Sequence, residues 1–269
     1  MLVNGRKYDI RVWVLLTHEM DLLFFKEGYI RTSCEEFSLD KDDLYVHLTN
    51  NAVQKYSNNY GSYEKGNQLS FDDIEEVFLQ LEDRSIPVTA ELSETTASAS
   101  PSKPVEEEPE DVSPAETPRM EESTARDEEP QSTLPPNEKP SFRKHVLPEI
   151  KRLITLSIES VKKKLNPQDR RFTFEIYGYD FMIDEQLKPW LIEVNTNPCI
   201  EESSPILEKL LPRMLHNAFQ LTLDLLFPPK AKNLAQMARL RYPVPNYPDD
   251  ENMWELLGNY RMEKRRGRK

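Results

Sequence analysis

An acidic, proline-rich stretch divides this chain and limits how it can fold. Between Pro87 and Pro140 the sequence holds 14 Asp and Glu against 4 Lys and Arg, together with 10 of the 21 prolines. Large apolar residues are almost absent, so this stretch buries too little surface to offset the entropy of ordering its backbone. We therefore predict a disordered insertion over residues 87–141, with a folded part built from the flanking segments.

The charge of the whole chain is concentrated in this insertion. The net charge is −12, and 4 − 14 = −10 of it lies between Pro87 and Pro140, which leaves −2 for the remainder. No apolar run approaches the roughly 20 residues of a membrane-spanning helix. The 2 cysteines do not form a disulfide framework and favour a reducing, cytoplasmic location. Neither nucleic acid nor a membrane is expected as a partner.

Four regions follow from this division. Residues 1–86 form a first folded segment, 87–141 the insertion, 142–228 a second folded segment and 229–269 a C-terminal extension. The extension ends in a basic tail, in which residues 261–269 hold six Lys and Arg against one Glu. Such a tail suits an acidic partner, for example a microtubule surface, but also RNA, membrane lipid or nuclear import.

The first segment begins with a strand over residues 7–15. Tyr8, Ile10, Val12 and Val14 alternate with polar residues, which predicts one buried face. An apolar run at 22–25, a turn at 26–28 and a short strand at 29–31 follow, and a helix begins at Ser70.

The second segment is predicted to hold helices and a pair of strands. A helix runs from Pro148 to about 165, where Asn166 and Pro167 end it. Strands over 172–183 and 190–195 follow, and a helix begins at Ser204-Pro205 and continues to about 227, with a break near Pro212. The chain is therefore assigned to the mixed α+β class.

The two strands of the second segment bring carboxylates together. If their hairpin closes with Asp184 opposite Pro189, then Asp180 lies opposite Glu193. Because side chains alternate along a strand, Glu193 and Asn195 share one face. Two carboxylates and an amide would then converge on one patch.

Like charges directly opposite each other are destabilising unless they share a proton or a cation. Three hard oxygen ligands without His or Cys suit Mg²⁺, which takes its remaining ligands from water and from the phosphates of a nucleotide. The alternative is a pair of exposed hairpin charges. On the opposite face, Ile192 and Val194 are expected to point into a core.

Lys7 and Arg11 add positive charge to the polar face of the first strand. Near a metal site, such cations neutralise the charge that develops in phosphoryl transfer. A solvated strand edge is the alternative. The sequence has no G-x-x-x-x-G-K-[ST] loop and no G-x-G-x-x-G motif, so ATP would be bound in another way.

Six short motifs in order sharpen this interpretation. They are Lys7-Tyr8-Asp9-Ile10-Arg11, Glu27-Gly28-Tyr29-Ile30-Arg31-Thr32, His47-Leu48-Thr49-Asn50-Asn51, Tyr56-Ser57-Asn58-Asn59-Tyr60-Gly61, Gly178-Tyr179-Asp180-Phe181-Met182 and Leu191-Ile192-Glu193-Val194-Asn195. Together they resemble the tubulin tyrosine ligase-like family, over roughly residues 7–227 apart from the insertion.

The resemblance implies an ATP-grasp fold, in which ATP lies between two α+β subdomains. It also implies that a carboxylate is phosphorylated and that an amine attacks the acyl phosphate. By this match Asp180, Glu193 and Asn195 would hold Mg²⁺. The nucleotide site would be lined by Lys7, Asp9, His47, Leu48, Thr49, Asn50 and Ile192. Arg11 would stabilise the transferring phosphoryl group, and Arg31 would hold the reacting amino acid or acceptor.

The expected activity is ligation of a free amino acid to tubulin, with glutamate favoured over glycine or tyrosine, in the cytoskeleton and by resemblance in cilia or axonemes. The family's ATP site also needs an N-terminal subdomain, expected before Lys7. The alternatives are therefore a fragment lacking that half of the site, or a non-catalytic microtubule-binding relative. A weaker alternative, an ATP-grasp ligase for a small peptide, leaves the motifs at 47–51 and 56–61 unexplained.

Overall fold

The computed structural model describes residues 1–81, 139–230 and 242–261, all of which belong to one of the two units of the chain. The predicted insertion at 87–141 lies outside the described residues except for its last three. The basic tail lies outside them beyond Arg261.

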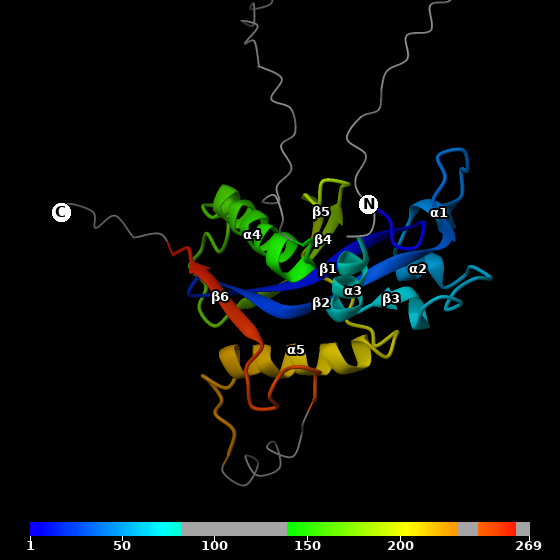
Figure 1. Ribbon diagram of the computed structural model, residues 1–269. Coiled ribbons are helices and arrows are strands. Elements are labelled where there is room, and N and C mark those ends of the chain that lie inside the picture. The colour runs from blue at the N-terminus through cyan, green and yellow to red at the C-terminus, as the bar shows by residue number, and fades with distance from the viewer. Residues whose placement is uncertain (82–138, 231–241, 262–269) are drawn as a thin grey trace, which may run out of the picture. The chain divides into compact units, whose positions relative to one another are not determined.

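An antiparallel sheet organises the described residues (Figure 1). Its strands are β1 (Arg6–Thr17), β2 (Asp21–Glu36), β3 (Gln68–Leu69), β4 (Phe174–Ile183), β5 (Pro189–Asn195) and β6 (Trp254–Asn259). The strand order is β3-β2-β1-β4-β5, and β6 pairs with β2 on the same side as β3. This arrangement confirms the mixed α+β class.

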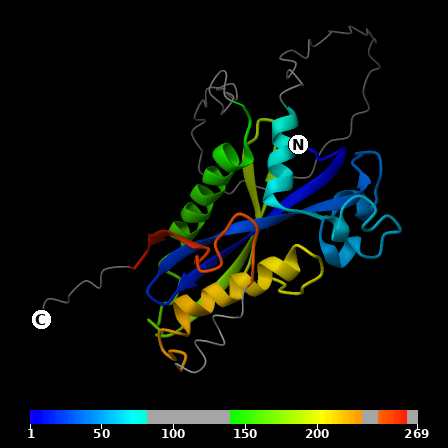
Figure 2. The ribbon, with the colours of Figure 1, turned by 60° about the horizontal axis from the view of Figure 1, so that its bottom comes forward.

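Helices cover both faces of the sheet. They are α1 (Leu44–His47), α2 (Asn51–Gln54), the 3-10 turn η1 (Lys65–Asn67), α3 (Phe71–Gln80), the π-helical turn η3 (Phe142–Val146), α4 (Leu147–Val161) and α5 (Leu207–Thr222). Figures 1 and 2 show α3 and α4 on one face, here the α4 face, and α5 on the other, here the α5 face.

The α4 face carries the larger apolar core. The predicted alternation in β1 is confirmed, because Tyr8, Ile10, Val12 and Val14 are all buried in one cluster. α3 and α4 contribute Phe78 and residues at helical spacing to the same cluster: Ile150, Ile154 and Ile158. Burial of this apolar surface is the main stabilising contribution on this face.

The α5 face combines an apolar half with a polar half. Trp13 packs against Tyr29 with ring centroids 5.5 Å apart and lies in one cluster with Met214 of α5. Trp254 of β6 donates its indole N–H to the backbone oxygen of Met214 (3.1 Å), which ties β6 to α5. The polar half, which begins at Arg11, is described below.

The turn predicted at 26–28 is wrong, because β2 continues from Asp21 to Glu36. Gly28 serves a different purpose there. A Cβ on Gly28 would lie 2.7 Å from Cζ of Phe71 and 2.4 Å from the backbone oxygen of Arg11. The missing side chain therefore lets α3 approach the sheet closely.

Two helix boundaries differ from the sequence-based expectation. α4 ends at Val161, four residues early, and is preceded by η3, where Ser141 accepts a hydrogen bond from the backbone N–H of Lys144 (3.1 Å). α5 runs from Leu207 to Thr222 and therefore ends about five residues before the expected boundary. It continues through Pro212, so the break expected there is wrong. Ser204 accepts from the backbone N–H of Leu207 (3.2 Å) and so supplies the expected cap.

β6 was not expected from the sequence. Its apolar pattern is too short to predict a strand by itself, and the strand is identified by its pairing with β2. No helix within the described residues is long and apolar enough to cross a membrane.

Candidate active site

A row of polar side chains crosses the α5 face of the sheet. In the strand register Tyr29 of β2 lies opposite Arg11 of β1, Arg11 opposite Asp180 of β4, and Asp180 opposite Glu193 of β5. The predicted pairing of Asp180 with Glu193 is therefore confirmed. Directly opposite residues project from the same face of a sheet, so four strands contribute side chains to one row.

The hairpin that produces this pairing closes differently from the expectation. Pro189 lies opposite Ile183 rather than Asp184, and a register shift follows between Asp180 and Phe181. The irregularity leaves Ile192 without a direct partner and restores the expected register at Glu193.

The expectation that Ile192 and Val194 point into a core is wrong. Their exposed fractions are 56% and 40%. The physical reason is that β5 is the last strand in the order β3-β2-β1-β4-β5 and so lies at the edge of the sheet, where fewer elements surround its side chains. Exposure is compatible with the role assigned to Ile192 in the nucleotide site, which stays a prediction.

Two arginines and two aspartates form a buried ion-pair network around this row. Arg11 donates Nε and Nη2 to the two oxygens of Asp180, the second at 2.9 Å. Arg31 makes the same bidentate contact with Asp9, to which it donates from Nε and Nη2, and the distance between Nε and Oδ1 is 2.7 Å. Its Nη2 also donates to Asp180 Oδ2 (2.8 Å). Asp180 therefore joins both guanidinium groups.

The electrostatics of the network favour the charged forms of Asp180, Arg11 and Arg31. Burial acts to raise the pKa of Asp180, whose exposed fraction is 2%, but the hydrogen bond from Arg11 and the charge of Arg31 outweigh it and hold that pKa below its ordinary value. Burial likewise opposes the charge of Arg11 and Arg31, and their bonded aspartates still raise both guanidinium pKa values.

Each arginine retains an unused donor. Within the described residues, Nη1 of Arg11 and Nη1 of Arg31 have no hydrogen-bond partner, and neither is among the fully buried unpartnered atoms. Two fixed guanidinium groups thus present free N–H groups next to the row. Such groups bind phosphate or carboxylate oxygens well, because their charge and orientation are set in advance.

The proposed metal ligands differ in accessibility. Glu193 is exposed, and Asn195 donates Nδ2 to its Oε1 (3.0 Å), which leaves the amide oxygen of Asn195 uncommitted. Asp180 is less accessible, since its two oxygens already receive three N–H contacts. The described residues contain no cluster of three or more His, Cys, Asp and Glu suited to a metal. The donor set of two carboxylates and one amide nevertheless fits Mg²⁺, with Glu193 and Asn195 best placed.

A glycine lets the chain after β5 fold over the network. Gly178 lies opposite Asn195, and a Cβ at this position would lie 2.9 Å from Cβ of Pro198 and 3.1 Å from Nη1 of Arg11. The first glycine of the Gly-Tyr-Asp motif therefore makes room for both the loop and the guanidinium group.

Apart from Ile192 on β5, the residues expected to line a nucleotide site lie near one end of β1 and β2. Lys7 is half-buried, and the register of β1 and β2 shifts between Arg6 and Tyr8. His47 of α1 contacts the ring of Phe37 just beyond β2, with centroids 5.9 Å apart. Thr49 is buried, whereas Leu48 and Asn50 are exposed. The structure thus brings the 47–50 segment to the end of the sheet that carries Lys7 and Asp9.

Gln54 attaches this segment to the sheet and was missed by the sequence-based reasoning. Its exposed fraction is 0%, and its Oε1 accepts from the backbone N–H of Cys34 in β2 (2.7 Å). Its Nε2 donates to the backbone oxygens of Leu48 and Tyr45, the latter at 3.2 Å. A polar residue three positions after the last residue of the His47–Asn51 motif gave no signal, because the sequence does not reveal that its side chain contacts the backbone of β2 and of the segment around α1.

Comparison with known proteins supports the resemblance. The family model described as the tubulin-tyrosine ligase family matches residues 1–85 and 128–234. Tubulin glycylase 3D of Tetrahymena thermophila is 26% identical over 83% of this chain and 17% of its own length. Human protein monoglycylase TTLL8 is 26% identical over 83% of this chain and 20% of its own length.

A relative named for a different activity is similar to about the same extent. The probable alpha-tubulin polyglutamylase Ttll1 of Tetrahymena thermophila is 25% identical over 83% of this chain and 41% of its own length. The chain therefore spans less than half the length of each of these relatives.

Proposed function

Because this chain belongs to the tubulin-tyrosine ligase family, we propose that it works in an ATP- and Mg²⁺-dependent ligase that joins an amino acid to tubulin. Family membership implies the ATP-grasp fold. When bound, ATP and Mg²⁺ would supply the phosphoryl group that activates a carboxylate as an acyl phosphate, which an amine then attacks to form an amide bond.

The observation that carries the proposal is the pair of arginines fixed by buried aspartates, each with a free Nη1 donor. In the proposed reaction Arg11 would neutralise the charge on the transferring phosphoryl group. Arg31 would orient the carboxylate of the amino acid or acceptor. Because Asp9 and Asp180 hold both groups before substrate arrives, little reorganisation is needed in the transition state.

The remaining site residues have supporting roles in this proposal. Glu193 and Asn195 would hold Mg²⁺, with Asp180 contributing to the same charge balance. Lys7, Asp9 and Ile192 would contact the nucleotide from the sheet. The 47–50 segment, attached through Gln54, would contact it from the side.

The amino acid is the finer question. Identities of 25% to a named polyglutamylase and 26% to named glycylases do not separate the two. We retain glutamate as the hypothesis, with glycine and tyrosine as the alternatives that the assay must distinguish.

The test is ATP-dependent incorporation of labelled glutamate, glycine or tyrosine into purified microtubules. Label from one amino acid, lost in Glu193→Gln, is expected. Glu185→Gln is the matched control, because Glu185 is an exposed carboxylate in the turn of the same hairpin. No incorporation from any of the three would reject the proposal for this chain and favour a microtubule-binding relative without ligase activity.

A further inference from the structure

Tyr29 lies in the polar row of the α5 face, next to both arginines of the ion-pair network. It is directly opposite Arg11 in the register of β1 and β2, and Arg31 follows two positions later on the same face of β2. The ring of Tyr29 packs against Trp13, and only 5% of the residue is exposed. The ring therefore belongs to the apolar half of this face, whereas the hydroxyl group needs a separate explanation.

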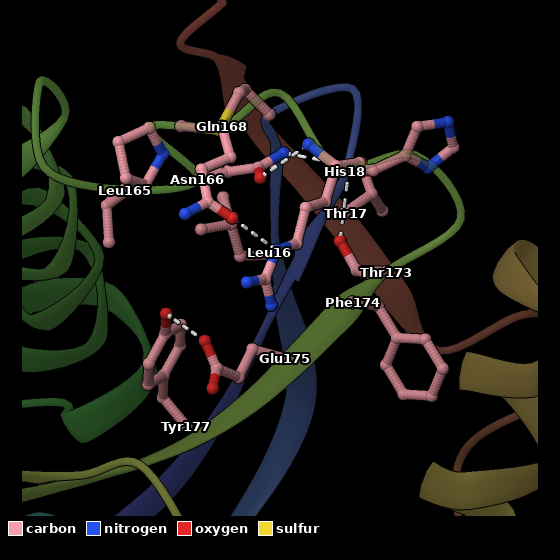
Figure 3. A pocket seen from close by; sticks show the side chains of 13 residues that line it. Leu16, Thr17, His18, Leu165, Asn166, Gln168, Thr173, Phe174, Glu175 and Tyr177 are labelled. Atoms are coloured by element: carbon pink, nitrogen blue, oxygen red, sulfur yellow. Dashed lines mark hydrogen bonds between the residues drawn. The ribbon is translucent and has the colours of Figure 1, made fainter.

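The buried tyrosines differ in what their hydroxyl groups contact. In the part of the chain that the structure describes they are Tyr8, Tyr29, Tyr177 and Tyr179. Figure 3 shows the hydroxyl of Tyr177, in the wall of a cavity of about 510 Å³, donating to Glu175 (3.0 Å). The hydroxyl of Tyr179 lies 2.8 Å from that of Ser157. Tyr8 and Tyr29 have no such partner among these residues.

The two hydroxyl groups without a partner lie in different surroundings. Tyr8 belongs to the apolar cluster on the α4 face, and its hydroxyl oxygen is fully buried. The hydroxyl oxygen of Tyr29 is not among the fully buried unpartnered atoms, so it remains accessible although the rest of the side chain is covered. Only Tyr29 can therefore offer its hydroxyl group to a ligand.

The charges of the network act directly on this hydroxyl group. Burial raises the pKa of Tyr29 above its ordinary value and outweighs the charges of Arg11 and Arg31, which act to lower it. The hydroxyl group therefore keeps its proton at neutral pH and can donate it in a hydrogen bond. Asp9 and Asp180 do not accept from it, because their carboxylates are bonded to the two arginines.

Packing alone explains the ring but not the accessible hydroxyl group. A phenylalanine would bury the same ring against Trp13. Tyr8 shows that this fold tolerates a hydroxyl group without a partner, so that feature by itself does not indicate a ligand. What distinguishes Tyr29 is its position on the same face as the unused Nη1 donors of Arg11 and Arg31. Several donors on one face without a matching acceptor are typical of a site for an oxyanion.

We propose that the hydroxyl group of Tyr29 donates a hydrogen bond to an oxygen of the phosphoryl group that Arg11 contacts. The identity of this oxyanion rests on the proposed function. The register favours the phosphoryl group over the carboxylate assigned to Arg31, because Tyr29 lies directly opposite Arg11. A neutral donor adds a directed contact to the transferring group without adding a third positive charge.

The test compares Tyr29→Phe with Tyr8→Phe. Each substitution removes one unpartnered hydroxyl group from a buried ring, but on opposite faces of the sheet. The probe is inorganic phosphate, titrated into the whole protein without ATP, amino acid or tubulin and followed by isothermal titration calorimetry at constant ionic strength. Tyr29→Phe should bind phosphate about tenfold more weakly than wild type, as expected for one hydrogen bond to a charged group. Tyr8→Phe should bind like wild type.

Two further measurements separate a ligand contact from a structural role. The thermal unfolding midpoint of Tyr29→Phe without phosphate should equal that of wild type, because the substitution removes no hydrogen bond among the described residues. Binding of acetate, which represents a carboxylate, should change little. Equal phosphate binding by wild type and Tyr29→Phe, an equal loss in Tyr8→Phe, a loss confined to acetate or no saturable phosphate binding by wild type would each overturn the proposal.

The incorporation assay keeps this proposal distinct from the ligase proposal. In an active chain, Tyr29→Phe should lower kcat per folded molecule about tenfold and leave the KM for the amino acid unchanged. If wild type incorporates nothing but its phosphate binding still depends on Tyr29, the ligase proposal fails for this chain and the Tyr29 contact stands. Unchanged kcat in Tyr29→Phe would overturn the Tyr29 contact even where the ligase proposal holds.

Discussion

The two faces of the sheet share the same strands, but different kinds of interaction stabilise Ile10 on one face and Arg11 on the other. Ile10 and Arg11 are neighbours on β1, and both are buried. Ile10 joins an apolar cluster with α3 and α4, in which many nonspecific contacts add up. Arg11 instead depends on one partner, Asp180, which lies 169 positions away in the sequence.

This difference should determine how much stability a single substitution removes at each of the two sites. An apolar contact weakens gradually when a side chain is shortened, because the neighbouring groups can relax. A buried charge that loses its partner leaves the other charge without compensation in a poorly solvating environment. Single substitutions of charged residues in the polar half of the α5 face should therefore cause a large loss of stability, whereas substitutions in the apolar core of the α4 face should cause a loss that grows with the size of the group removed.

The largest effect is expected from Asp180→Asn. Its carboxylate joins Arg11 and Arg31, and an amide cannot compensate two buried guanidinium charges. The free energy of unfolding, measured by urea denaturation, should fall by about 3–5 kcal/mol. Glu185→Gln in the neighbouring turn should stay within about 0.5 kcal/mol of wild type. A similarly small effect of Asp180→Asn would remove the proposed contrast between the faces.

The same variant tests whether the negative charge of Asp180 stabilises the folded protein. The pKa of Asp180 is lowered in the folded protein, because the contacts to Arg11 and Arg31 outweigh burial. An unfolded Asp titrates near pH 3.9, so the stabilisation should be complete above about pH 5 and decline as the pH falls below about 4. The difference in unfolding free energy between wild type and Asp180→Asn should shrink in that range. A difference independent of pH would assign the effect to packing.

On the α4 face, Ile10→Ala should lower the unfolding free energy by roughly 2–5 kcal/mol, and Ile10→Val by about 0.5–1.5 kcal/mol. Ile10 has an exposed fraction of 0% and no charged partner. Incorporation per folded molecule should be unchanged in both variants. Loss of incorporation in the stable Ile10→Val protein would show that the two faces are coupled.

Gly178→Ala tests whether the loop after β5 and the side chain of Arg11 both need the space that the glycine leaves. The added methyl group would lie 2.9 Å from Cβ of Pro198 and 3.1 Å from Nη1 of Arg11. Overpacking of this kind costs about 1–3 kcal/mol of unfolding free energy. Displacement of Arg11 should also reduce the incorporation measured per folded molecule, which a loss of stability alone would not change. Adding Pro198→Gly should restore part of the lost incorporation. No recovery would mean that the loop is not what the methyl group displaces.

The smallest effect is expected from Ser70→Ala. Ser70 and Asp73 form a reciprocal capping box at the start of α3 on the α4 face. Losing the cap should lower the unfolding free energy by about 0.5–2 kcal/mol, measured by thermal denaturation. Incorporation at a temperature where the variant is folded should equal that of wild type.

The elements predicted correctly from the sequence are those with a local signature. The alternation of Tyr8 to Val14 predicted β1, and the helix start predicted at Ser70 matches the N-cap of α3. The turn predicted at Gly28 failed because the sequence does not reveal that Phe71 packs against that position. β6 was missed because it is defined by its pairing with β2.

The candidate site shows the same division. The pairing of Asp180 with Glu193 followed from counting along a hairpin, even though the hairpin closes one residue away from the expected position. The six ordered motifs indicated the family without any structure. In contrast, the bridging of Asp180 to Arg31, the attachment of the 47–50 segment by Gln54 and the exposure of Ile192 could not be read from the sequence.

Local patterns decide which side of a strand or helix is apolar, because the repeat of each element places side chains on faces in a fixed order. They therefore sufficed for the class of the fold, the hairpin carboxylates and the family. Which charges meet depends on how strands from distant segments are aligned, and burial of those charges depends on what covers them. Arg11, Arg31, Asp9 and Asp180 became one network only when β1, β2 and β4 were placed side by side in the sheet.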